Sequence, residues 1–386
     1  MRDFPAADID SETVSILRSL LFDWYRPETR NLPWRGRRTP WSVWVSEIML
    51  QQTRAEVVRE RFEDFVSRFP NPEAMAAVDV DEVVAQWSGL GYYRRARSLH
   101  AAACVVVDKH AGVVPAAVDD LGALPGVGAY TAAAVASIAY GQPAAAIDGN
   151  VERVFARLLG LEEDPSRGSA KKRLRAFADA MIDRLRPGDW NEALMDLGAL
   201  VCTPRSPDCA KCPWRQHCAA RAGERQNEIP LRAAAAPVRL LPLASLVLAG
   251  PNGVLLLRRA DTESWMPGMW ELPTVPTVLG VPAPEVAQMA LANLVRRRTG
   301  LRIRASACGA RVTHSIVNRR LQVELFQART RVVGASGKDW CFADGPARGR
   351  LGLSSLVGKS LAATAPATAP ATATAPATTP ATTTAN

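Results

Sequence analysis

The chain contains no uninterrupted apolar run long enough to cross a bilayer, which requires roughly 20 residues. Its first stretch, from Met1 to Ser11, is acidic and has neither the basic start nor the apolar core of a signal peptide. Both absences favour a soluble protein in a reducing compartment such as the cytoplasm. Structural disulfides are rare in such a compartment, so the cysteines need another explanation.

Cysteine is also scarce, with seven in 386 residues, but four of them lie within residues 202–218. The spacing is Cys202-x6-Cys209-x2-Cys212-x5-Cys218, and this crowding predicts that four thiolates bind one metal centre. Four sulfur ligands suit either zinc or an iron–sulfur cluster. Zinc sites usually present two CxxC pairs, whereas this loop has one, so the spacing favours the cluster. The other three cysteines are scattered and are expected to be core thiols.

The length of the chain predicts two domains, because 386 residues exceed a single hydrophobic core. Residues 1–225 have apolar residues at helical spacing, which predicts an all-α domain. Residues 226–239 lose this periodicity and predict a linker. Residues 240–361 have strand-like spacing and one helix near 284–299, which predicts a smaller α+β domain. Residues 362–386 are almost only Ala, Thr and Pro, and we expect them to be disordered.

The charge of the chain indicates a class of partner. A formal net charge of +9 is more than solubility requires, and it favours a polyanion such as nucleic acid. A basic face that is merely solvated is the alternative, and charge alone does not decide between the two.

A glycine-rich turn at residues 121–128 (LGALPGVG) separates two predicted helices, the second of which begins at Ala129. Glycine permits close backbone approach, so the amides of Gly126 and Gly128 and the N-terminus of the second helix can hold a phosphate. A plain turn between helices is the alternative. The motif followed by a long Ala-rich helix favours phosphate binding.

LPGVG together with the cysteine spacing resembles the helix-hairpin-helix DNA glycosylases of the endonuclease III superfamily. Within that superfamily, further blocks resemble the adenine DNA glycosylases, or MutY family. These blocks are residues 32–35 (LPWR), 46–53 (SEIMLQQT), 89–93 (GLGYY) and 147–151 (IDGNV). The resemblance implies one 4Fe–4S cluster on Cys202, Cys209, Cys212 and Cys218.

Position 130 distinguishes the subfamilies. Bifunctional relatives carry a nucleophilic Lys two residues beyond LPGVG, and this chain has Tyr130 there. A phenol cannot form the Schiff base that begins strand cleavage. The resemblance therefore implies a monofunctional glycosylase, which removes a base and leaves the strand intact.

Glu47 is the candidate general acid. It belongs to a helix expected to begin with Thr39 as cap and Pro40 in the first turn, and it borders the apolar stripe of that helix. Poor solvation would raise its pKa, so that it could hold a proton near neutral pH and protonate a departing adenine. A solvated Glu at the edge of the stripe is the alternative, and the resemblance favours the catalytic role.

Asp148 is the candidate carboxylate partner. It precedes Gly149 and most simply caps a helix, but an ionised carboxylate there would also stabilise the oxocarbenium charge that develops on the sugar. The resemblance implies that Tyr130 and Asn150 support this site. It further implies that Arg35 and Glu192 line the adenine pocket.

A base inside a duplex must be flipped out before it can react. Gln52, Leu90 and Tyr92 match the residues that insert beside the partner base in the family. Three arginines follow directly, and we expect them to lie on an exposed basic face that approaches phosphates: Arg94, Arg95 and Arg97.

The second domain resembles the Nudix-like module with which MutY proteins inspect 8-oxoguanine, through residues 255–259 (LLLRR) and 265–273 (WMPGMWELP). A working Nudix hydrolase has an acidic helix where this chain has residues 293–299 (NLVRRRT), and arginines cannot hold a divalent cation. The basic helix suits contact with a DNA backbone. Asn318 stands where the family often has a lesion-reading His, and its amide is able to hydrogen-bond a base edge.

These observations predict an enzyme that acts as a monomer on double-stranded DNA in the bacterial nucleoid and removes adenine mispaired with 8-oxoguanine or guanine. Two alternatives remain. An endonuclease III-like glycosylase for oxidised pyrimidines shares the fold but should have Lys at position 130 and has no reason for the second domain. A non-catalytic iron–sulfur DNA-binding protein would not need the carboxyl group of Glu47.

Overall fold

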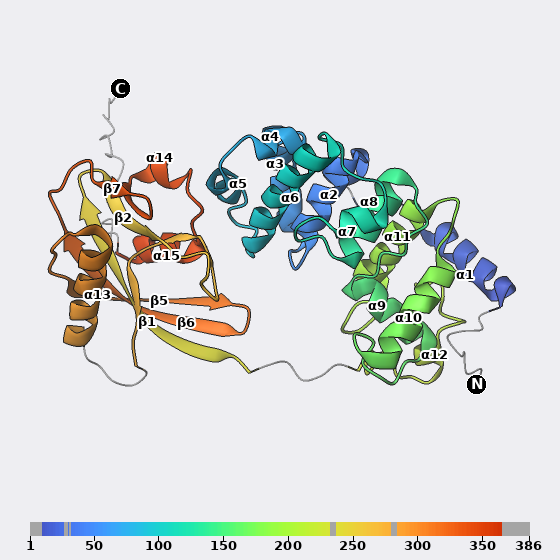
Figure 1. Ribbon diagram of the computed structural model, residues 1–386. Helices are drawn as coiled ribbons and strands as arrows, with labels where there is room; N and C mark the ends of the chain where they lie inside the picture. Colours follow the sequence, from blue (N-terminus) through green and yellow to red (C-terminus); the bar gives the residue numbers. More distant parts are fainter. Residues whose placement is uncertain (1–9, 27–29, 31, 232–236, 279–283, 365–386) are drawn as a thin grey trace, which may run out of the picture. The chain divides into compact units, whose positions relative to one another are not determined.

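Figure 1 shows a computed structural model of the chain, which describes residues 10–26, 30, 32–231, 237–278 and 284–364. The chain forms two compact units. One is helical and consists of Met1–Val238, Leu257–Glu271 and Ala343–Ser355; the other consists of Arg239–Leu256, Leu272–Phe342 and Leu356–Asn386. Part of the expected linker (232–236) and most of the expected disordered tail (365–386) lie outside the described residues.

The helical unit confirms the all-α prediction for the first part of the chain. Short connections join helices that fold back on one another. The helices are α1 (Ser11–Trp24), the 3-10 helix η2 (Pro33–Gly36), α2 (Pro40–Leu50), α3 (Ala55–Arg68), α4 (Pro72–Ala76), α5 (Val80–Gln86), α6 (Arg94–His110), α7 (Val118–Gly122), α8 (Ala129–Tyr140), α9 (Gly149–Leu159), α10 (Gly168–Met181), α11 (Pro187–Asp196), the π-helical turn η3 (Leu197–Val201) and α12 (Ala219–Ala222).

Two apolar clusters form the core of this unit. Large aromatic rings dominate both, and pairs such as Trp41 and Trp44 meet edge to face, with ring centroids 5.6 Å apart. The first cluster is built mainly by η2 and helices α2 to α6, and it includes Trp34, Trp44, Phe62, Phe65 and Trp87. The second is built mainly by α1, α9, α10 and α11, and it includes Leu21, Phe155, Phe177, Trp190 and Trp214.

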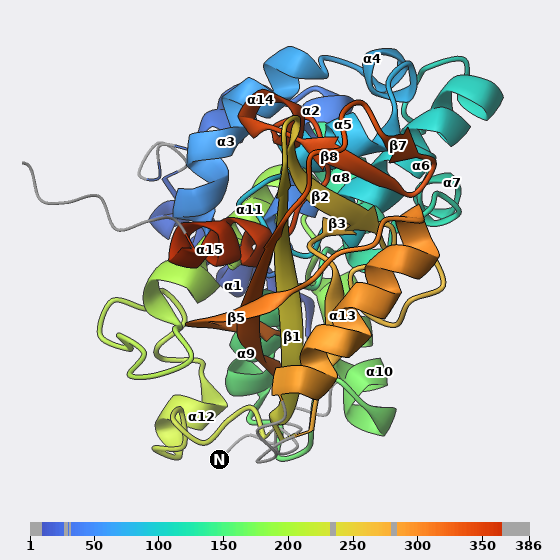
Figure 2. The same cartoon turned by 90° about the vertical axis from the view of Figure 1, so that its left-hand side faces the viewer.

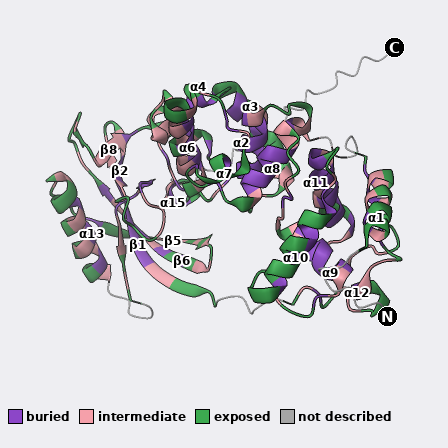
Figure 3. Cartoon of the chain, turned by 45° about the vertical axis from the view of Figure 1, so that its right-hand side comes forward, coloured by how far each residue is buried: buried purple, intermediate pink, exposed green. Residues whose placement is uncertain are grey.

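Helix α8 lies at the centre of the unit, in contact with α2, α7 and α11. Its residues from Thr131 to Ser137 are buried without interruption, which Figure 3 shows as a continuous purple segment. Six alanines in the helix let its neighbours approach closely, because their side chains add little width. Although α8 is apolar on every side, neither it nor any other described helix is long and apolar enough to cross a membrane.

The second unit is built on a mixed sheet, in agreement with the predicted α+β class. Strands β1 and β6 pair in parallel over residues 239–249 and 319–329, and β5 and β6 form an antiparallel hairpin. The strand order is β5-β6-β1-β2-β8-β7, with β3 beside β2 and β4 beside β1. The strands are β1 (Arg239–Gly250), β2 (Gly253–Arg258), β3 (Trp270–Glu271), β4 (Thr274–Pro276), β5 (Ser306–Ile316), β6 (Arg319–Arg329), β7 (Ser336–Gly337) and β8 (Trp340–Ala343).

Helix α13 (Pro284–Thr299) packs along this sheet beside β1, as Figure 2 shows, and buries Ala287, Leu291 and Val295. Its bounds confirm the helix predicted near 284–299. Helix α14 (Gly345–Arg348) belongs to the residues of the first unit, and α15 (Ser355–Thr364) ends the described chain. Because α15 continues to Thr364, the prediction of disorder from residue 362 onward is wrong for its first three residues.

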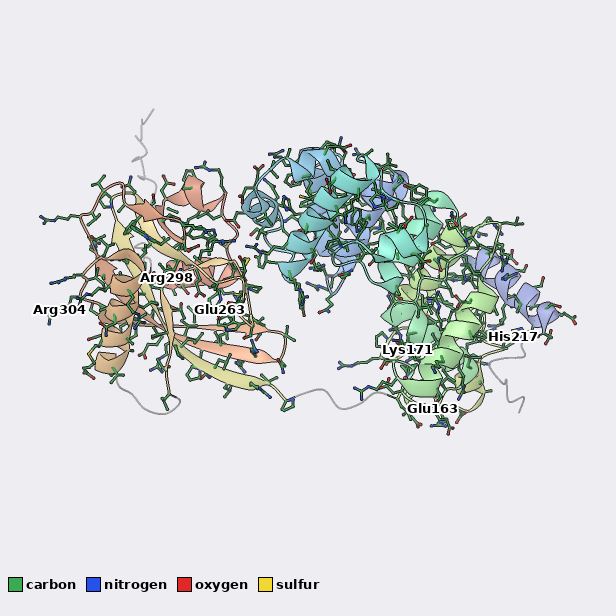
Figure 4. The ribbon with its side chains drawn as sticks, viewed as in Figure 1. Glu163, Lys171, His217, Glu263, Arg298 and Arg304 are labelled. Carbon is green, nitrogen blue, oxygen red and sulfur yellow. The ribbon has the colours of Figure 1, made fainter. Side chains whose placement is uncertain are left out.

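The basic end of α13 is a surface feature of the second unit. Arg296 and Arg297 lie in its last turn and are exposed, and Arg298 donates to the carbonyl of Asp339 at 3.2 Å. Figure 4 shows Arg304, just beyond the helix, extending away from the body of the unit. This placement agrees with a cationic surface here.

Gly188 tests the close packing around α8. A Cβ atom at this position would lie 2.9 Å from the Cα atom of Ile138 and 3.0 Å from the carbonyl oxygen of Ser137. Both are backbone atoms of α8, which cannot move as a flexible side chain can. We expect Gly188→Ala to lower the free energy of unfolding by about 1–3 kcal/mol, measured by urea denaturation and tryptophan fluorescence.

Gly122→Ala is the matched control, because a Cβ atom there would meet nothing within 4 Å and its φ is ordinary. Alanine favours a helix over glycine by up to about 1 kcal/mol, so this variant should be as stable as the natural chain or more stable. Equal effects of the two substitutions would contradict the packing argument.

Candidate active site

Helix α2 carries Glu47 into the interior. Thr39 caps the helix by accepting from the backbone N–H of Ser42 at 3.2 Å, and Pro40 occupies the first turn, as predicted. Every residue from Trp41 to Met49 is buried, and Glu47 itself is 5% exposed. The structure therefore rules out the alternative of a solvated Glu at the edge of an apolar stripe.

Burial decides the protonation of Glu47, because desolvation disfavours a charged carboxylate. It raises the pKa of Glu47 from 4.5 to about 7, while a hydrogen bond donated by the Tyr130 hydroxyl acts in the opposite direction. The negative charge of Asp148 raises the pKa of Glu47 further, so the two carboxyl groups interact. Burial also raises the pKa of Tyr130 well above 10, which keeps its hydroxyl protonated.

Asp148 begins helix α9, as its position in the sequence predicts. Its Oδ1 accepts from the backbone N–H groups of Asn150 at 2.8 Å and Val151 at 2.7 Å, and its Oδ2 accepts from Asn150 Nδ2 at 2.9 Å. Burial raises the pKa of Asp148, but these hydrogen bonds and the nearby Arg153 all favour the ionised form. Among the described residues, the Asp148 carboxylate thus accepts hydrogen bonds from two backbone N–H groups and one side-chain amide, whereas the Glu47 carboxyl group accepts one, from the Tyr130 hydroxyl.

A cavity of about 530 Å³ opens beside Asp148. It gives a ligand access to one of the two carboxyl groups and to the exposed Gln52. The lining residues come from the end of α2, the start of α9 and the segment before Pro230: Leu50, Gln52, Asp148, Gly149, Asn150, Arg153, Pro204, Asn227, Glu228, Ile229 and Pro230.

Two arginines on one face of α9 join this site to the cysteine loop. Arg153 donates to Asn150 Oδ1 at 2.9 Å and to the carbonyl oxygens of Gly198 and Cys202, each at 2.8 Å. Arg157 donates to the sulfur of Cys202 at 3.3 Å and to several backbone carbonyls of the adjoining loops. Sequence reasoning missed both roles, although their i, i+4 spacing already placed them on one helix face.

The four cysteines of the loop surround a single small cavity of about 20 Å³. Burial raises the pKa of Cys212 to about 12 and also raises the pKa values of Cys209 and Cys218, so binding a metal centre must release protons from these thiols. Arg157, Arg215 and Arg221 also line this cavity and supply positive charge. The set of sulfur donors with cations around it fits an anionic iron–sulfur cluster. Within the described residues, no three His, Cys, Asp or Glu side chains are arranged to hold a single metal ion.

The loop is anchored to the rest of the helical unit by Trp214. Its indole Nε1 donates to the carbonyl of Leu17 at 2.9 Å, and its ring stacks against Phe155 with centroids 6.2 Å apart. Since Phe155 belongs to α9, the ring contact and the two arginines all fix the loop to the same helix. A shift of α9 would therefore move the loop, and a shift of the loop would move α9.

The predicted phosphate turn lies between α7 and α8. Gly126 has φ +76°, and a Cβ atom there would lie 2.4 Å from Cβ of Ser98, so both its conformation and its contact require glycine. Gly128 is the N-cap of α8 in an extended conformation and has open space beside it. The geometry leaves room for an anion at this helix N-terminus.

Arg35 and Glu192, the residues expected to line an adenine pocket, lie close together but do not line the cavity beside Asp148. Arg35 Nε lies 3.9 Å from Glu192 Oε1, and Arg35 also pairs with Asp196 at 2.7 Å. Glu192 accepts from the hydroxyl of Tyr25 at 3.0 Å and from Arg38 at 2.6 Å. Burial raises the pKa of Glu192, and the charges of Arg35 and Arg38 oppose this effect. The charge of Glu192 raises the pKa of Glu47, and the charge of Arg35 lowers it.

The three residues expected to insert into DNA differ in exposure. Gln52 and Tyr92 are exposed, and both have positive φ, at 54° and 46°. Leu90 is 4% exposed and packs in the first apolar cluster, so the structure does not favour insertion of its side chain. Asn318 belongs to the second unit, in the turn between β5 and β6, next to Val317, which is 75% exposed.

The expectation of three exposed arginines at the start of α6 is wrong for two of them. Arg95 points inward and donates to backbone carbonyls. Arg97 is largely buried and lies 3.5 Å from Asp81. Arg94 is exposed as expected. The three share a sequence pattern, so only tertiary contacts distinguish them.

Comparison with known families agrees with this geometry. Residues 45–179 match the model of the HhH-GPD superfamily base excision DNA repair proteins, and residues 202–218 match the iron–sulfur binding domain of endonuclease III. An adenine DNA glycosylase of Buchnera aphidicola subsp. Acyrthosiphon pisum is 30% identical over 254 residues, which cover 66% of this chain and 73% of that protein. The chain belongs to the adenine DNA glycosylase family.

Human adenine DNA glycosylase is 33% identical to this family member over 344 residues, covering 75% of this chain. The match spans 62% of the human protein, so the chain accounts for about three fifths of that relative's length. A solved structure of a thermostable thymine-DNA glycosylase is 30% identical, with a TM-score of 0.51, and covers 56% of this chain and 100% of that one. This adenine DNA glycosylase family member carries a 4Fe–4S cluster, and the matched residues 202–218 contain its four clustered cysteines.

The raised pKa of Glu47 predicts a pH dependence of stability. Between about pH 4.5 and 7 the folded state keeps a proton that the unfolded state has released, so the free energy of unfolding should fall as the pH rises through this range. Glu47→Gln cannot titrate. Relative to Glu47→Gln, the natural chain should lose on the order of 2 kcal/mol between pH 4.5 and 8, measured by urea denaturation.

Tyr130→Phe sharpens this test, because it removes the hydrogen bond that favours ionised Glu47. The pH range of the effect should move upward in this variant. A difference between the natural chain and Glu47→Gln that stays constant from pH 4.5 to 8 would contradict the buried, titrating carboxyl group.

The cysteine loop predicts a coloured, iron-containing protein. The purified chain should be brown and contain iron, and Cys212→Ser should lose iron and unfold at lower urea concentration, since one ligand is gone. Cys104→Ser is the matched control, because Cys104 lies on α6, outside the loop, and its loss should leave the iron content unchanged. A colourless protein with stoichiometric zinc would overturn the assignment.

Proposed function

We propose that this chain is a monofunctional DNA glycosylase that hydrolyses the N-glycosidic bond of adenine mispaired with 8-oxoguanine or guanine in duplex DNA. It acts as a monomer in the cytoplasm, where its substrate is chromosomal DNA. The observation that carries the proposal is the pair of interacting carboxyl groups with unequal environments, Glu47 and Asp148.

The two carboxyl groups have different roles in hydrolysis. Glu47, with a pKa of about 7, donates its proton to a ring nitrogen of adenine, so that the base departs as a neutral molecule. Cleavage of the bond leaves oxocarbenium charge on the sugar, which the ionised carboxylate of Asp148 stabilises. Water then adds to the sugar carbon and gives its proton to the Glu47 carboxylate, which restores the acid. Asn150 holds Asp148 in place through the hydrogen bond between Nδ2 and Oδ2.

Tyr130 supports the monofunctional assignment. Its hydroxyl donates to Glu47 and lies 3.7 Å from the sulfur of Met195, so the ring closes one side of the site. A phenol in this position orients the acid but offers no amine to attack the sugar. The product is therefore an abasic site in an intact strand.

Recognition of adenine falls to Arg35 and Glu192 in this proposal. Adenine presents both donors and acceptors on its edges, and a guanidinium beside a carboxylate offers the complement. The exposed side chains of Gln52 and Tyr92 fill the space that the flipped nucleotide leaves. Backbone amides at Gly126 and Gly128 hold a phosphate of the DNA strand.

The second unit contributes recognition of the base opposite adenine. It follows the Nudix-like module of the family, and the last turn of α13 carries three arginines where hydrolysis of a nucleoside diphosphate would need acidic residues. Asn318, in the turn that joins β5 and β6, supplies amide donors and an acceptor for the edge of 8-oxoguanine.

Base release from a set of four duplexes tests the proposal. The chain should release adenine opposite 8-oxoguanine and opposite guanine, and it should leave adenine opposite thymine and thymine glycol opposite adenine intact. Glu47→Gln should release adenine at least about 100-fold more slowly while binding the duplex as tightly, because only the proton donor is removed.

Two outcomes would contradict the proposal. Release of thymine glycol, or strand nicking without heat or alkali, would indicate an endonuclease III-like enzyme. Full cellular function of Glu47→Gln would indicate a non-catalytic iron–sulfur DNA-binding protein.

A further inference from the structure

Arg95, the second residue of α6, makes an unusual set of contacts for an arginine at a predicted nucleic-acid surface. Its guanidinium donates five hydrogen bonds, all to neutral oxygens. Nη1 donates to the carbonyls of Ile48 at 2.7 Å and Met49 at 2.8 Å. Nη2 donates to Thr53 Oγ1 and the carbonyl of Leu90, each at 2.9 Å, and to that of Gly91 at 3.1 Å.

Removing the Arg95 guanidinium from water costs free energy. Burial lowers the pKa of Arg95 to about 10, and its Nε atom has no partner within the described chain. The rings of Trp87 and Tyr92 lie 5.3 and 5.7 Å from the guanidinium carbon and recover part of the cost through cation–π contact. A buried cation with neutral partners adds little stability, so its value lies in the geometry it enforces.

That geometry joins two segments that are distant in sequence. Ile48 and Met49 lie at the C-terminal end of α2, where carbonyls have no intrahelical partner, immediately after Glu47. Leu90 and Gly91 lie in the turn before α6. The hydroxyl of Thr53 also donates to the carbonyl of Leu90 at 3.2 Å, so the two segments touch directly.

Each segment presents one exposed side chain on a positive-φ residue. Gln52 follows α2 with φ 54°, and Tyr92 follows the turn with φ 46°. Such conformations cost of order 1–3 kcal/mol for residues other than glycine and persist when the surroundings impose them. Arg95 donates to backbone carbonyls of both segments at once, next to both of these residues.

We propose that Arg95 is a positioning residue, which fixes the separation of Gln52 and Tyr92 so that both enter the base stack of a bound duplex while Glu47 stays in place. Lys cannot replace it, because one ammonium group cannot reach five acceptors in two segments. The proposal rests on the proposed function for the identity of the duplex, but it concerns the step in which bases are unstacked.

The test uses the full chain and a duplex with adenine opposite 8-oxoguanine. 2-Aminopurine is placed in the complementary strand beside the 8-oxoguanine, where its fluorescence rises when bases unstack. Arg95→Met keeps an unbranched apolar side chain, lacks the guanidinium and loses all five hydrogen bonds. We expect it to abolish most of the fluorescence rise at saturating protein and to slow single-turnover adenine release about 10- to 100-fold, with duplex affinity nearly unchanged.

Arg95→Lys should recover only part of both signals, although it keeps the charge. Thr53→Val keeps the shape and removes the hydroxyl that accepts from Arg95 and donates to Leu90, so it should lower the fluorescence rise in the same direction by a smaller factor. If Arg95→Met does not fold, these two variants decide the question. Fluorescence and single-turnover rates equal to those of the natural chain in both would overturn the proposal.

Val106→Ala is the matched control for lost stability. Val106 lies on α6 and is fully buried, away from both segments, so its truncation lowers the urea midpoint without touching the contacts of Arg95. If Val106→Ala lowers the fluorescence rise as much as Arg95→Met, Arg95 has only a structural role and the proposal is wrong. A natural chain that unstacks the duplex but releases no adenine would refute the proposed function and leave the role of Arg95 intact.

Discussion

The position of α9 is the constraint on which the helical unit depends. Its N-terminus is fixed by the cap that Asp148 provides, and its side is fixed to the cysteine loop by Arg153, Arg157 and Phe155. The two attachments share a short stretch of rigid helix. A change in the loop would therefore move the backbone that orients the Asp148 carboxylate. The π-helical turn η3 tightens this arrangement, since a Cβ atom at Gly198 would lie 2.6 Å from Cβ of Asn150.

Chemical asymmetry in the site follows from which groups surround each carboxyl group. Burial raises the pKa of both, although Asp148 also lines the cavity of about 530 Å³. Two backbone amides, an amide side chain and a nearby guanidinium, all supplied by the first turns of α9, oppose the rise in the pKa of Asp148. Glu47 is in the middle of α2, where the backbone amides are already used within the helix, and among the described residues it accepts a hydrogen bond from the Tyr130 hydroxyl alone. One carboxyl group at a helix start and one in a helix interior are thus sufficient to separate their proton affinities.

Local patterns in the sequence predicted the elements and several of the site residues. Thr39 and Asp148 were identified as caps because a cap is decided by a few adjacent residues, and the helix at 284–299 was found because its period is long and regular. The inward direction of Arg95 and the burial of Leu90 were not predicted, since both depend on α2 and α6 meeting across a large separation in sequence. The helix that includes residues 362–364 was missed because its end has the same Ala and Thr composition as the tail.

The buried arginine of α6 also has a consequence for the electrostatics of the helical unit. An arginine held by a carboxylate contributes almost no net charge to the surroundings, whereas the five acceptors of Arg95 are neutral oxygens that leave its charge uncancelled. The carbonyl dipoles solvate the guanidinium locally, and its field still extends to the surface near Gln52 and Tyr92. The chain has a net charge of +9, and Arg95 adds to the positive field that attracts phosphates although it does not contact a phosphate itself. Replacing the carbonyl acceptors by a carboxylate would hold the turn equally well, but it would place a negative charge next to the side chains that must meet a polyanion.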